Sequence, residues 1–318
     1  MSDQATNAAD ISLAADFETP SQADWEREVL KVLNRRRPEG KELSIEQAYK
    51  RLTSTTVDGL SIKPLYTRED GPEELGYPGV APFTRGTTLR DGLAADGIDV
   101  SGVLQTTAVG TGVAMILVED IGQNRIVLAA GANGALTPDD IEAQAALIGG
   151  AAMLVLQLEV PMPVVERAIA IAHNAGVPVL LNPGPAKPLA EALWSQIDIL
   201  IPNESEAELL SGIAVTDAAS AYTAARVFRQ RGVKCVLITL GANGVAVIDD
   251  AGERHLPAHV VKAVDTTAAG DTFIGGLTAG LVEGMAMDEA VALGQRASAL
   301  CVTRHGAQPS IPYRREIA

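Results

Sequence analysis

Short, almost purely apolar runs alternate with amphipathic stretches over residues 89–318. Buried parallel strands are typically apolar on both faces, so such runs predict strands of a parallel sheet. The runs lie at 151–158, 177–181, 197–201 and 235–240. We therefore expect an α/β fold here, a doubly wound and mostly parallel sheet flanked by helices.

Cap and turn residues bound the stretches between these runs and predict helices. Thr137, Pro138 and two following acids are typical of a helix start, and this helix should run to about Ile148. Two further helices are expected, each ended by a glycine: 163–175 before Gly176, and 216–231, capped by Thr216, before Gly232.

Two hairpins are also expected. The dipeptide Asn243-Gly244 separates the run at 235–240 from another at 245–248 and is a strong turn signal. A second hairpin should join 112–118 to 125–130 across residues 120–124.

The first 88 residues have a different composition. They hold 6 of the 11 aromatic residues and 6 of the 17 prolines. Residues 25–33 and 44–52 are predicted to form amphipathic helices, the second with Ser44 and Gln47 at capping-box spacing. Prolines and glycines interrupt every pattern over 53–88, which predicts an extended arm or linker. The N-terminal segment is therefore expected to be partly irregular and partly helical.

Charge and composition exclude several classes of protein. The chain carries 25 Lys and Arg against 40 Asp and Glu, a net charge of -15, which argues against binding to nucleic acid or to an anionic membrane surface. The N-terminus lacks the features of a secretory signal, and no apolar run approaches the ~18–20 residues of a membrane helix, so we expect a cytoplasmic protein. Cys235 and Cys301 lie among apolar or small residues and are expected to be buried thiols.

The most informative segment surrounds Asp271. A predicted strand ends near Val264, small residues follow, and a helix then runs through Gly275 and Leu281. The start of such a helix offers unpaired N–H groups to an anion, and Asp271 beside it could accept a hydroxyl proton during phosphoryl transfer. The structural alternative is that Asp271 is only an N-cap.

The sequence DTTAAGDTF at 265–273 resembles the signature of the PfkB/ribokinase family of carbohydrate kinases. Five further segments match that family in the same order: QLE at 157–159, NPGPA at 182–186, NESE at 203–206, TLGANG at 239–244 and TRHGAQPS at 303–310. Taken alone, 203–206 could be a helix start, 239–244 a plain hairpin, and 303–310 a loop. Together they imply a ribokinase-like fold over 89–318, with the hairpin at 112–130 as a partial β lid.

This resemblance implies an ATP-dependent kinase that uses Mg²⁺ and often K⁺. It implies that Asp271 deprotonates the primary hydroxyl of a pentose, most simply D-ribose, giving ribose 5-phosphate. The other implied roles are an anion hole at Ala268, Ala269 and Gly270; sugar contact at Glu159; nucleotide contact at Asn203, Thr239, Gly241, Gly244 and Gly270; Mg²⁺ held through water by Glu206; and K⁺ held by Asp265, Thr267, Cys301, Arg304, Gly306 and Ser310.

The N-terminal part of the family pattern is missing from this sequence. The resemblance implies a first strand with a sugar-binding Asp and then a Gly-Gly-x-x-x-Asn segment, whereas the Gly-Gly pairs here are at 149–150 and 275–276. Residues 1–88 instead resemble the N-terminal arm of a methylmalonyl-CoA mutase subunit, through DGLSIKPLYT at 58–67 and PGVAPFTRG at 78–86. We expect a mutase-like arm over 1–88 and an N-terminally truncated kinase domain over 89–318.

Two kinds of function follow from this combination. One is a sugar kinase whose partners are ATP and a small sugar, impaired because its sugar anchors are missing. The other is a non-catalytic nucleotide-binding protein, or one whose arm docks on a mutase subunit. Members of the kinase family usually pair through their lids, so a homodimer is a further expectation of the resemblance.

Overall fold

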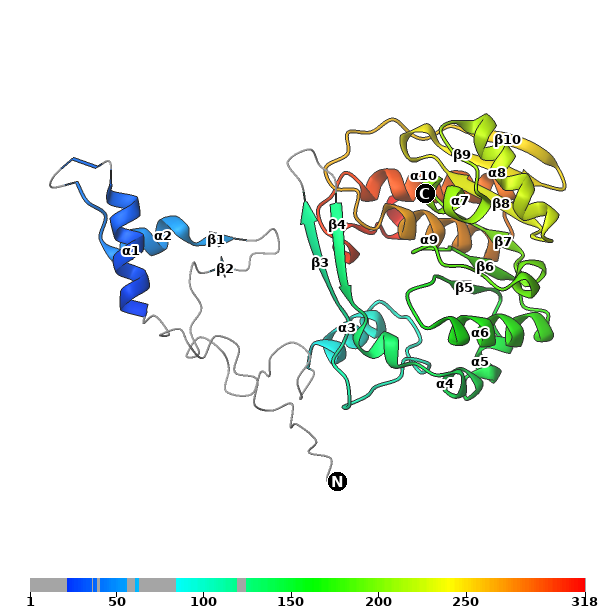
Figure 1. Ribbon diagram of the computed structural model, residues 1–318, viewed down its shortest axis with the longest axis horizontal. Helices are drawn as coiled ribbons and strands as arrows, with labels where there is room; N and C mark the ends of the chain where they lie inside the picture. The colour runs from blue at the N-terminus through cyan, green and yellow to red at the C-terminus, as the bar shows by residue number, and fades with distance from the viewer. Residues whose placement is uncertain are drawn as a thin grey trace, which may run out of the picture. The chain divides into compact units, whose positions relative to one another are not determined.

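The computed structural model describes residues 22–35, 37–38, 41–55, 61–62, 84–118 and 124–317. The chain divides into two units, Met1–Leu75 and Gly76–Ala318, which we consider separately (Figure 1). No helix in the described part of the chain combines the length and the apolarity needed to cross a membrane.

The first unit contains two helices that the sequence predicted, α1 (Gln22–Asn34) and α2 (Ile45–Leu52). Ser44 and Gln47 form the expected capping box at the start of α2. The helices meet through the Trp25 and Tyr49 rings, whose centroids are 5.8 Å apart.

The expected extended arm over 53–88 is wrong from Thr84 onward, where a helix begins. The short strands β1 (Ser54–Thr55) and β2 (Ser61–Ile62) pair antiparallel, and helix α3 (Thr84–Ala95) crosses residue 88. The prolines that motivated the prediction end at Pro82, and the helix accommodates Gly86 and Gly92. Residues 63–83 lie outside the described residues.

The second unit is built on a six-stranded sheet of order β10-β9-β8-β7-β6-β5. Strands β5 (Leu154–Leu156), β6 (Val179–Leu181), β7 (Ile199–Leu200) and β8 (Cys235–Thr239) run parallel, each inside one predicted apolar run. Strands β9 (Val245–Asp249) and β10 (Gly252–Leu256) continue the sheet antiparallel. This confirms the doubly wound, mostly parallel α/β class.

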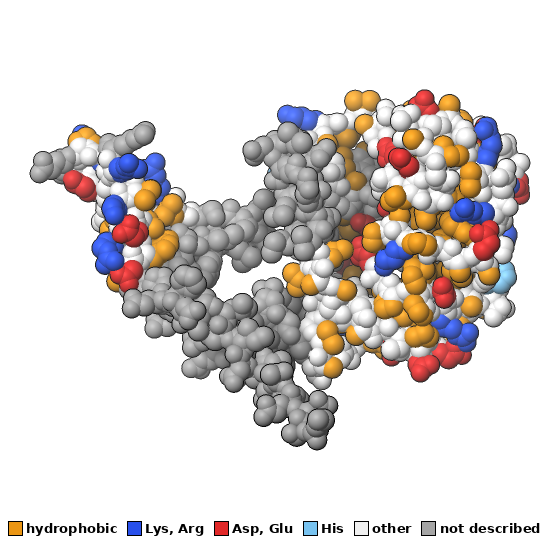
Figure 2. All heavy atoms as spheres, viewed as in Figure 1, with side chains coloured by type: hydrophobic (Ala, Val, Ile, Leu, Met, Phe, Trp, Pro, Cys, Tyr) orange, Lys and Arg blue, Asp and Glu red, His pale blue; other side chains and the backbone are white. Residues whose placement is uncertain are grey.

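Helices cover both faces of this sheet (Figure 1), and apolar and charged side chains are interspersed on the face of this unit seen in Figure 2. Helices α6 (Met162–Ala175) and α8 (Ala218–Gln230) pack on one face with Trp194 and Phe228, and α9 (Ala269–Val282) and α10 (Met287–Cys301) pack on the other. Successive strand residues supply the two cores alternately, since their side chains point to opposite faces. The remaining helices and 3-10 turns are η3 (Gly131–Ala135), α4 (Pro138–Glu142), α5 (Ala145–Gly149), η4 (Glu191–Gln196), α7 (Glu204–Ser211), η5 (Gly241–Asn243), η6 (Gln308–Ser310) and η7 (Arg314–Glu316).

Two helix predictions need correction. The helix expected from Thr137 to Ile148 is divided into α4 and α5, because Gln144 leaves the helical conformation at φ -101°, ψ 11°. Helix α8 is capped by Asp217 and not by Thr216, because Asp217 and Ser220 form a capping box. Helix α6 ends at Gly176 as predicted, with a left-handed φ of 73°.

Both hairpins are present. Strands β3 (Val113–Val118) and β4 (Asn124–Ala129) pair antiparallel in a separate two-stranded sheet. Strands β8 and β9 also pair, but their connection spans 240–244 and includes η5, so it is longer than the expected two-residue turn. Gly244, at φ 96°, is required there, since a Cβ would lie 2.1 Å from the Leu256 carbonyl oxygen.

Candidate active site

Loops at the carboxyl ends of the parallel strands lie at one edge of the sheet, where doubly wound folds bind their ligands. The loop after β5 is tied to the loop after β6, because the Leu158 N–H donates to the Gly184 carbonyl at 2.9 Å. The loop after β7 is tied to the end of β8, because the Thr239 N–H donates to the Pro202 carbonyl at 3.0 Å. This edge carries Glu159, Asn203 and Thr239, three of the predicted site residues.

Asn203 and Glu206 open helix α7 through a reciprocal pair of hydrogen bonds. The Asn203 Oδ1 accepts from the Glu206 N–H, and the Glu206 Oε2 accepts from the Asn203 N–H, both at 2.9 Å. The helix-start interpretation of this segment is therefore correct as local structure. Burial raises the pKa of the Glu206 carboxyl, and the charge of Glu204 adds to that rise, against the opposing hydrogen bond from Asn203.

The other oxygen of Glu206 faces the loop after β6. A Cβ built on Gly184 would lie 2.9 Å from the Glu206 Oε1 and 3.1 Å from the Asn182 Oδ1. Glycine therefore allows this loop to approach the carboxylate closely. The segment 182–186 matched the family pattern but had no predicted role.

Helix α9 begins at a turn of small residues immediately before Asp271. Ala268 is its N-cap and lies in the left-handed region at φ 59°, with no side-chain cap bond. The alternative that Asp271 is the N-cap is therefore wrong, and Asp271 is instead an exposed residue of the first turn. No acceptor in the described part of the chain takes the N–H of Gly270 or Asp271. These two donors and the helix dipole make the turn suitable for an anion.

The strand expected before this turn is absent. Residues 257–264 have no regular structure, and Val264 and Asp265 instead donate main-chain N–H bonds to the Val302 carbonyl, at 2.7 and 3.2 Å. The turn is thus attached to the loop after α10 and not to the sheet. Residues 260–264 are exposed in the structure, so their apolar composition does not reflect the burial that predicts a strand.

Asp265 connects the two loops that carry the predicted cation residues. Its Oδ1 accepts from the Thr267 N–H and its Oδ2 from the Gly306 N–H, each at 2.9 Å. Hydrogen bonding from the Thr267 side chain, and then from the Gly306 N–H, lowers the pKa of the Asp265 carboxyl. The carboxylate is therefore ionised at neutral pH.

The remaining cation residues lie at the same place. The buried Cys301 thiol donates to the Thr267 carbonyl at 3.7 Å and lies 3.1 Å from the Ser310 Oγ. Arg304 turns its guanidinium away, to Glu316 at 2.6 Å. The structure thus brings the six predicted residues together, Cys301 at the end of α10 and the others in the adjoining segments 265–267 and 304–310, and it confirms that Cys235 and Cys301 are buried free thiols.

Other predicted residues are placed near the sheet edge without direct contact to Asp271. Gly241 lies beside Glu204, since a Cβ there would be 4.0 Å from the Glu204 Oε1. Glu159 is exposed after the buried Leu158, and no contact among the described residues joins Glu159 to Asp271. A contact that the sequence could not reveal is the bond from the Ser298 Oγ to the Ala269 carbonyl at 2.9 Å.

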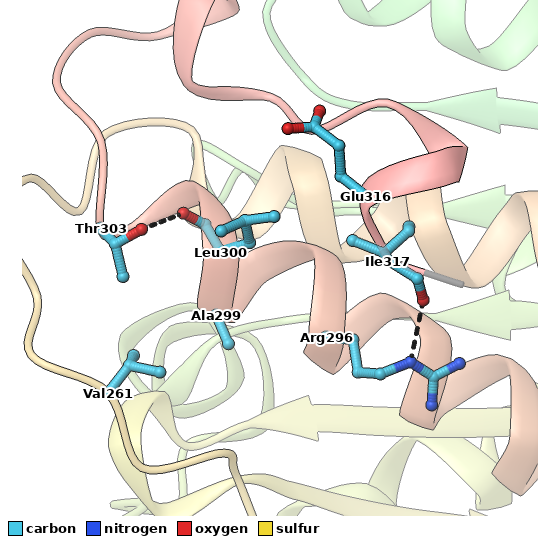
Figure 3. A pocket seen from close by; sticks show the side chains of 7 residues that line it. All are labelled: Val261, Arg296, Ala299, Leu300, Thr303, Glu316 and Ile317. Atoms are coloured by element: carbon cyan, nitrogen blue, oxygen red, sulfur yellow. Dashed lines mark hydrogen bonds between the residues drawn. The ribbon is translucent and has the colours of Figure 1, made fainter.

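Two cavities lie outside this group of residues. The first, of 290 Å³, is formed by α10 and the C-terminal segment, with the Arg296 Nε donating to the Ile317 carbonyl at 3.2 Å (Figure 3). The second, of 380 Å³, lies against η4 and the ends of α7 and α8. Neither is lined by Asp271 or Glu159.

The doubly wound sheet, the loops at its carboxyl edge and the turn before α9, with two N–H groups free for an anion, define an α/β protein suited to a phosphorylated ligand. Residues 79–314 match the pattern of the pfkB family of carbohydrate kinases, and the chain belongs to this family. It is 46% identical to the ribokinase of Haemophilus influenzae over 231 residues, 73% of this chain and 76% of that protein.

Two further comparisons describe the two parts of the chain. The solved structure of Arabidopsis thaliana ribokinase, complexed with ribose and ATP, matches with a TM-score of 0.60 and 32% identity, covering 65% of this chain and 68% of that one. A separate match of 55% identity over 98 residues joins 28% of this chain to 15% of the methylmalonyl-CoA mutase small subunit of Propionibacterium freudenreichii. Both predicted resemblances are confirmed.

Proposed function

We propose that this chain transfers the γ-phosphoryl group of ATP to the primary hydroxyl of a pentose, most simply D-ribose, giving ribose 5-phosphate. The observation that carries the proposal is the position of Asp271. Its carboxylate is exposed in the first turn of α9, beside the acceptor-free N–H groups of Gly270 and Asp271. The ribokinase relatives, one of them solved with ribose and ATP, support the choice of substrate.

In this mechanism Asp271 accepts the proton of the sugar hydroxyl while the hydroxyl oxygen attacks the γ-phosphorus. The bond to the bridging oxygen breaks, and ADP leaves with the electron pair. The N–H groups at the start of α9 stabilise the negative charge on the transferring phosphoryl oxygens. Thr239, Gly241 and Gly244 border the nucleotide, and Glu159 contacts the sugar.

The chain's donor groups fit the two proposed cations. No three His, Cys, Asp or Glu side chains converge as a metal site among the described residues, so Mg²⁺ would be held mainly by ATP phosphates and by water bound to Glu206. The ionised Asp265 and the loop carbonyls around it suit K⁺. Mg²⁺ would neutralise phosphate charge, and K⁺ would hold the loops on either side of the anion-binding turn.

A second function is favoured by one feature of the sequence. The Gly-Gly-x-x-x-Asn segment of the family pattern is absent, and the Gly-Gly pairs lie at 149–150 and 275–276. A poorly held sugar can cost ~10²-fold or more in rate, so the proposed turnover is slow. If turnover is negligible, the function is binding of ATP without action on a sugar. A mutase-like arm over 1–88 could then dock on a mutase subunit.

The test is ribose-dependent release of ADP, measured in a coupled assay beside calorimetry of ATP binding. We expect ribose to stimulate release, and Asp271→Asn to lower the stimulated rate by ~10²–10⁴-fold while ATP still binds. The matched control is Asp139→Asn, which removes a carboxylate from the first turn of another helix and should leave the rate unchanged. ATP binding with no dependence on ribose would support the second function.

A further inference from the structure

The cavity of 380 Å³ is separate from the candidate active site and has a distinct chemistry. Its lining comes from the loop after β6, from η4 and from the ends of α7 and α8: Ala186, Lys187, Pro188, Leu189, Glu191, Trp194, Leu209, Leu210 and Arg231. Five of these residues have an apolar side chain larger than that of alanine, and two, Lys187 and Arg231, are cations. None is among the residues assigned above to sugar, nucleotide or cation binding.

The two cations have no carboxylate partner. Among the described residues neither Lys187 nor Arg231 has an acid within ion-pair distance, whereas Arg229, two residues earlier, pairs with Asp250 at 2.6 Å. Glu191 is the one acid of the lining, so the lining carries a net positive charge.

Both cations have N–H groups that make no hydrogen bond within the described part of the chain. Lys187 donates from its Nζ to the Leu158 carbonyl, and Arg231 donates from its Nη1 to the Leu210 carbonyl at 3.3 Å. A lysine has three donors and an arginine five, so each retains N–H groups for a ligand. The Arg231 guanidinium is also held in place over the Trp194 ring, 5.0 Å from its centroid.

The rest of the cavity is apolar and partly exposed. Leu209 is 74% exposed although it lies beside the half-buried Leu210, and Trp194, at 2% exposed, forms the floor beneath Arg231. An apolar wall with unpaired cations at its rim matches a molecule that has one anionic group and an apolar body. The positive lining disfavours a metal ion as the ligand.

We propose that this cavity is a binding site for a small organic carboxylate, whose anionic group contacts Lys187 and Arg231 and whose apolar body covers Leu209 and Leu210. Charge-assisted hydrogen bonds to the two cations supply the selectivity for an anion. The proposal does not depend on the kinase activity proposed above, because its residues and its test concern binding alone.

The site can be tested through Trp194, one of the two tryptophans of the chain. In the full-length Trp25→Phe protein, Trp194 is the remaining indole and reports on Arg231 above it. The probe is phenylacetate, and its neutral counterpart phenylacetamide has nearly the same size. We expect phenylacetate to change the Trp194 emission saturably, with a dissociation constant of about 1 mM or tighter, and phenylacetamide to bind at least about tenfold more weakly.

A variant pair gives an independent readout. Lys187→Met keeps an apolar side chain of similar length and should weaken phenylacetate binding about tenfold, while Lys50→Met, which removes an exposed cation from α2, should change nothing. Equal affinity for phenylacetate and phenylacetamide would overturn the proposal without reference to any variant. So would an unsaturable response, or a Lys187→Met protein that binds as tightly as its parent.

Discussion

Two glycines, Gly276 in α9 and Gly294 in α10, determine how closely these helices approach. A Cβ on Gly294 would lie 2.6 Å from the Phe273 carbonyl oxygen and 3.0 Å from a carbon of its ring. A Cβ on Gly276 would lie 2.9 Å from the Gly294 Cα and 3.2 Å from the Ala297 Cβ. Two of these four neighbours are backbone atoms and a third is an alanine Cβ, none of which can rotate away, so an added methyl group must push the helices apart.

The expected cost follows from two opposing terms. Overpacking a well-filled interior costs ~1–3 kcal/mol, and the contact at Gly294 is short enough to place it at the upper end. Alanine has a higher helix propensity than glycine, which raises the free energy of unfolding by ~1 kcal/mol. Gly294→Ala should therefore lower the free energy of unfolding by ~2 kcal/mol, and Gly276→Ala by ~1 kcal/mol.

Gly275 provides the matched control, since it lies in the same helix with nothing within 4 Å of its Cβ position. Gly275→Ala should raise the free energy of unfolding by ~0.5–1 kcal/mol through propensity alone. The assay is urea unfolding of the full-length chain, followed by Trp194 emission in the Trp25→Phe background and by circular dichroism. The reasoning is refuted if Gly294→Ala is as stable as its parent, or if Gly275→Ala loses as much stability as Gly294→Ala.

Two further predictions concern charges and caps in the same unit. Asp249 forms a two-pronged ion pair with Arg254, with both N–O distances 2.8 Å, and this hydrogen bonding lowers the pKa of the Asp249 carboxyl below its usual 3.8. The pair therefore stabilises the fold fully above pH 3.8, and this stabilisation is lost as the pH falls through the lowered pKa. In urea titrations at pH 7, Asp249→Asn should lower the free energy of unfolding by ~1–2 kcal/mol. The difference in this free energy between variant and parent should become smaller in acid. Asp217→Ala should destabilise by ~1 kcal/mol through loss of the α8 cap, while equal losses from Asp217→Ala and Thr216→Ala would contradict the capping assignment.

The strands could be predicted because burial on both faces requires apolar residues at every position. The run at 235–240 corresponds to β8 almost residue for residue, whereas only Leu154–Leu156 of the run at 151–158 forms a strand. Position at the edge of the sheet does not explain this difference, since β7 pairs on both sides and yet has two residues of the run at 197–201. An apolar run indicates that its residues are buried. The length of the strand depends on its pairing with adjacent strands, which the local sequence does not show.

Helix ends were less predictable for a local reason. Thr216 and Asp217 are adjacent and both suit an N-cap, so composition cannot choose between them. The choice is made by Ser220, whose N–H reaches the Asp217 Oδ1 at 2.8 Å, and this depends on the register of the first turn. The start of the helix at Pro138 was predicted correctly from its cap residues. Its interruption at Gln144 was not predicted, because no glycine or proline lies there to indicate it.

The chemistry of the candidate site was predictable where it is carried by neighbours in sequence. Ala268, Gly270 and Asp271 lie within four residues, and a small-residue turn before a helix has one common geometry. Contacts between distant segments carry no local signal: the family resemblance placed Asp265 and Gly306 in one cation site, but nothing indicated the bond of Lys187 to Leu158. These bonds depend on which loops the sheet brings together, and no local pattern encodes that.

The close packing of α9 and α10 connects the stability of the fold to the candidate site. Helix α9 begins at the turn that holds Asp271, and α10 ends at Cys301, where the loop with Gly306 starts. The Ser298 Oγ on α10 binds the Ala269 carbonyl at the first residue of α9, at 2.9 Å. A methyl group that separates the helices at Gly276 and Gly294 therefore also strains this bond. The position of Asp271 relative to the Asp265 loop thus depends on an approach that only glycine permits, made at Phe273 and Gly276 and not at the carboxylate itself.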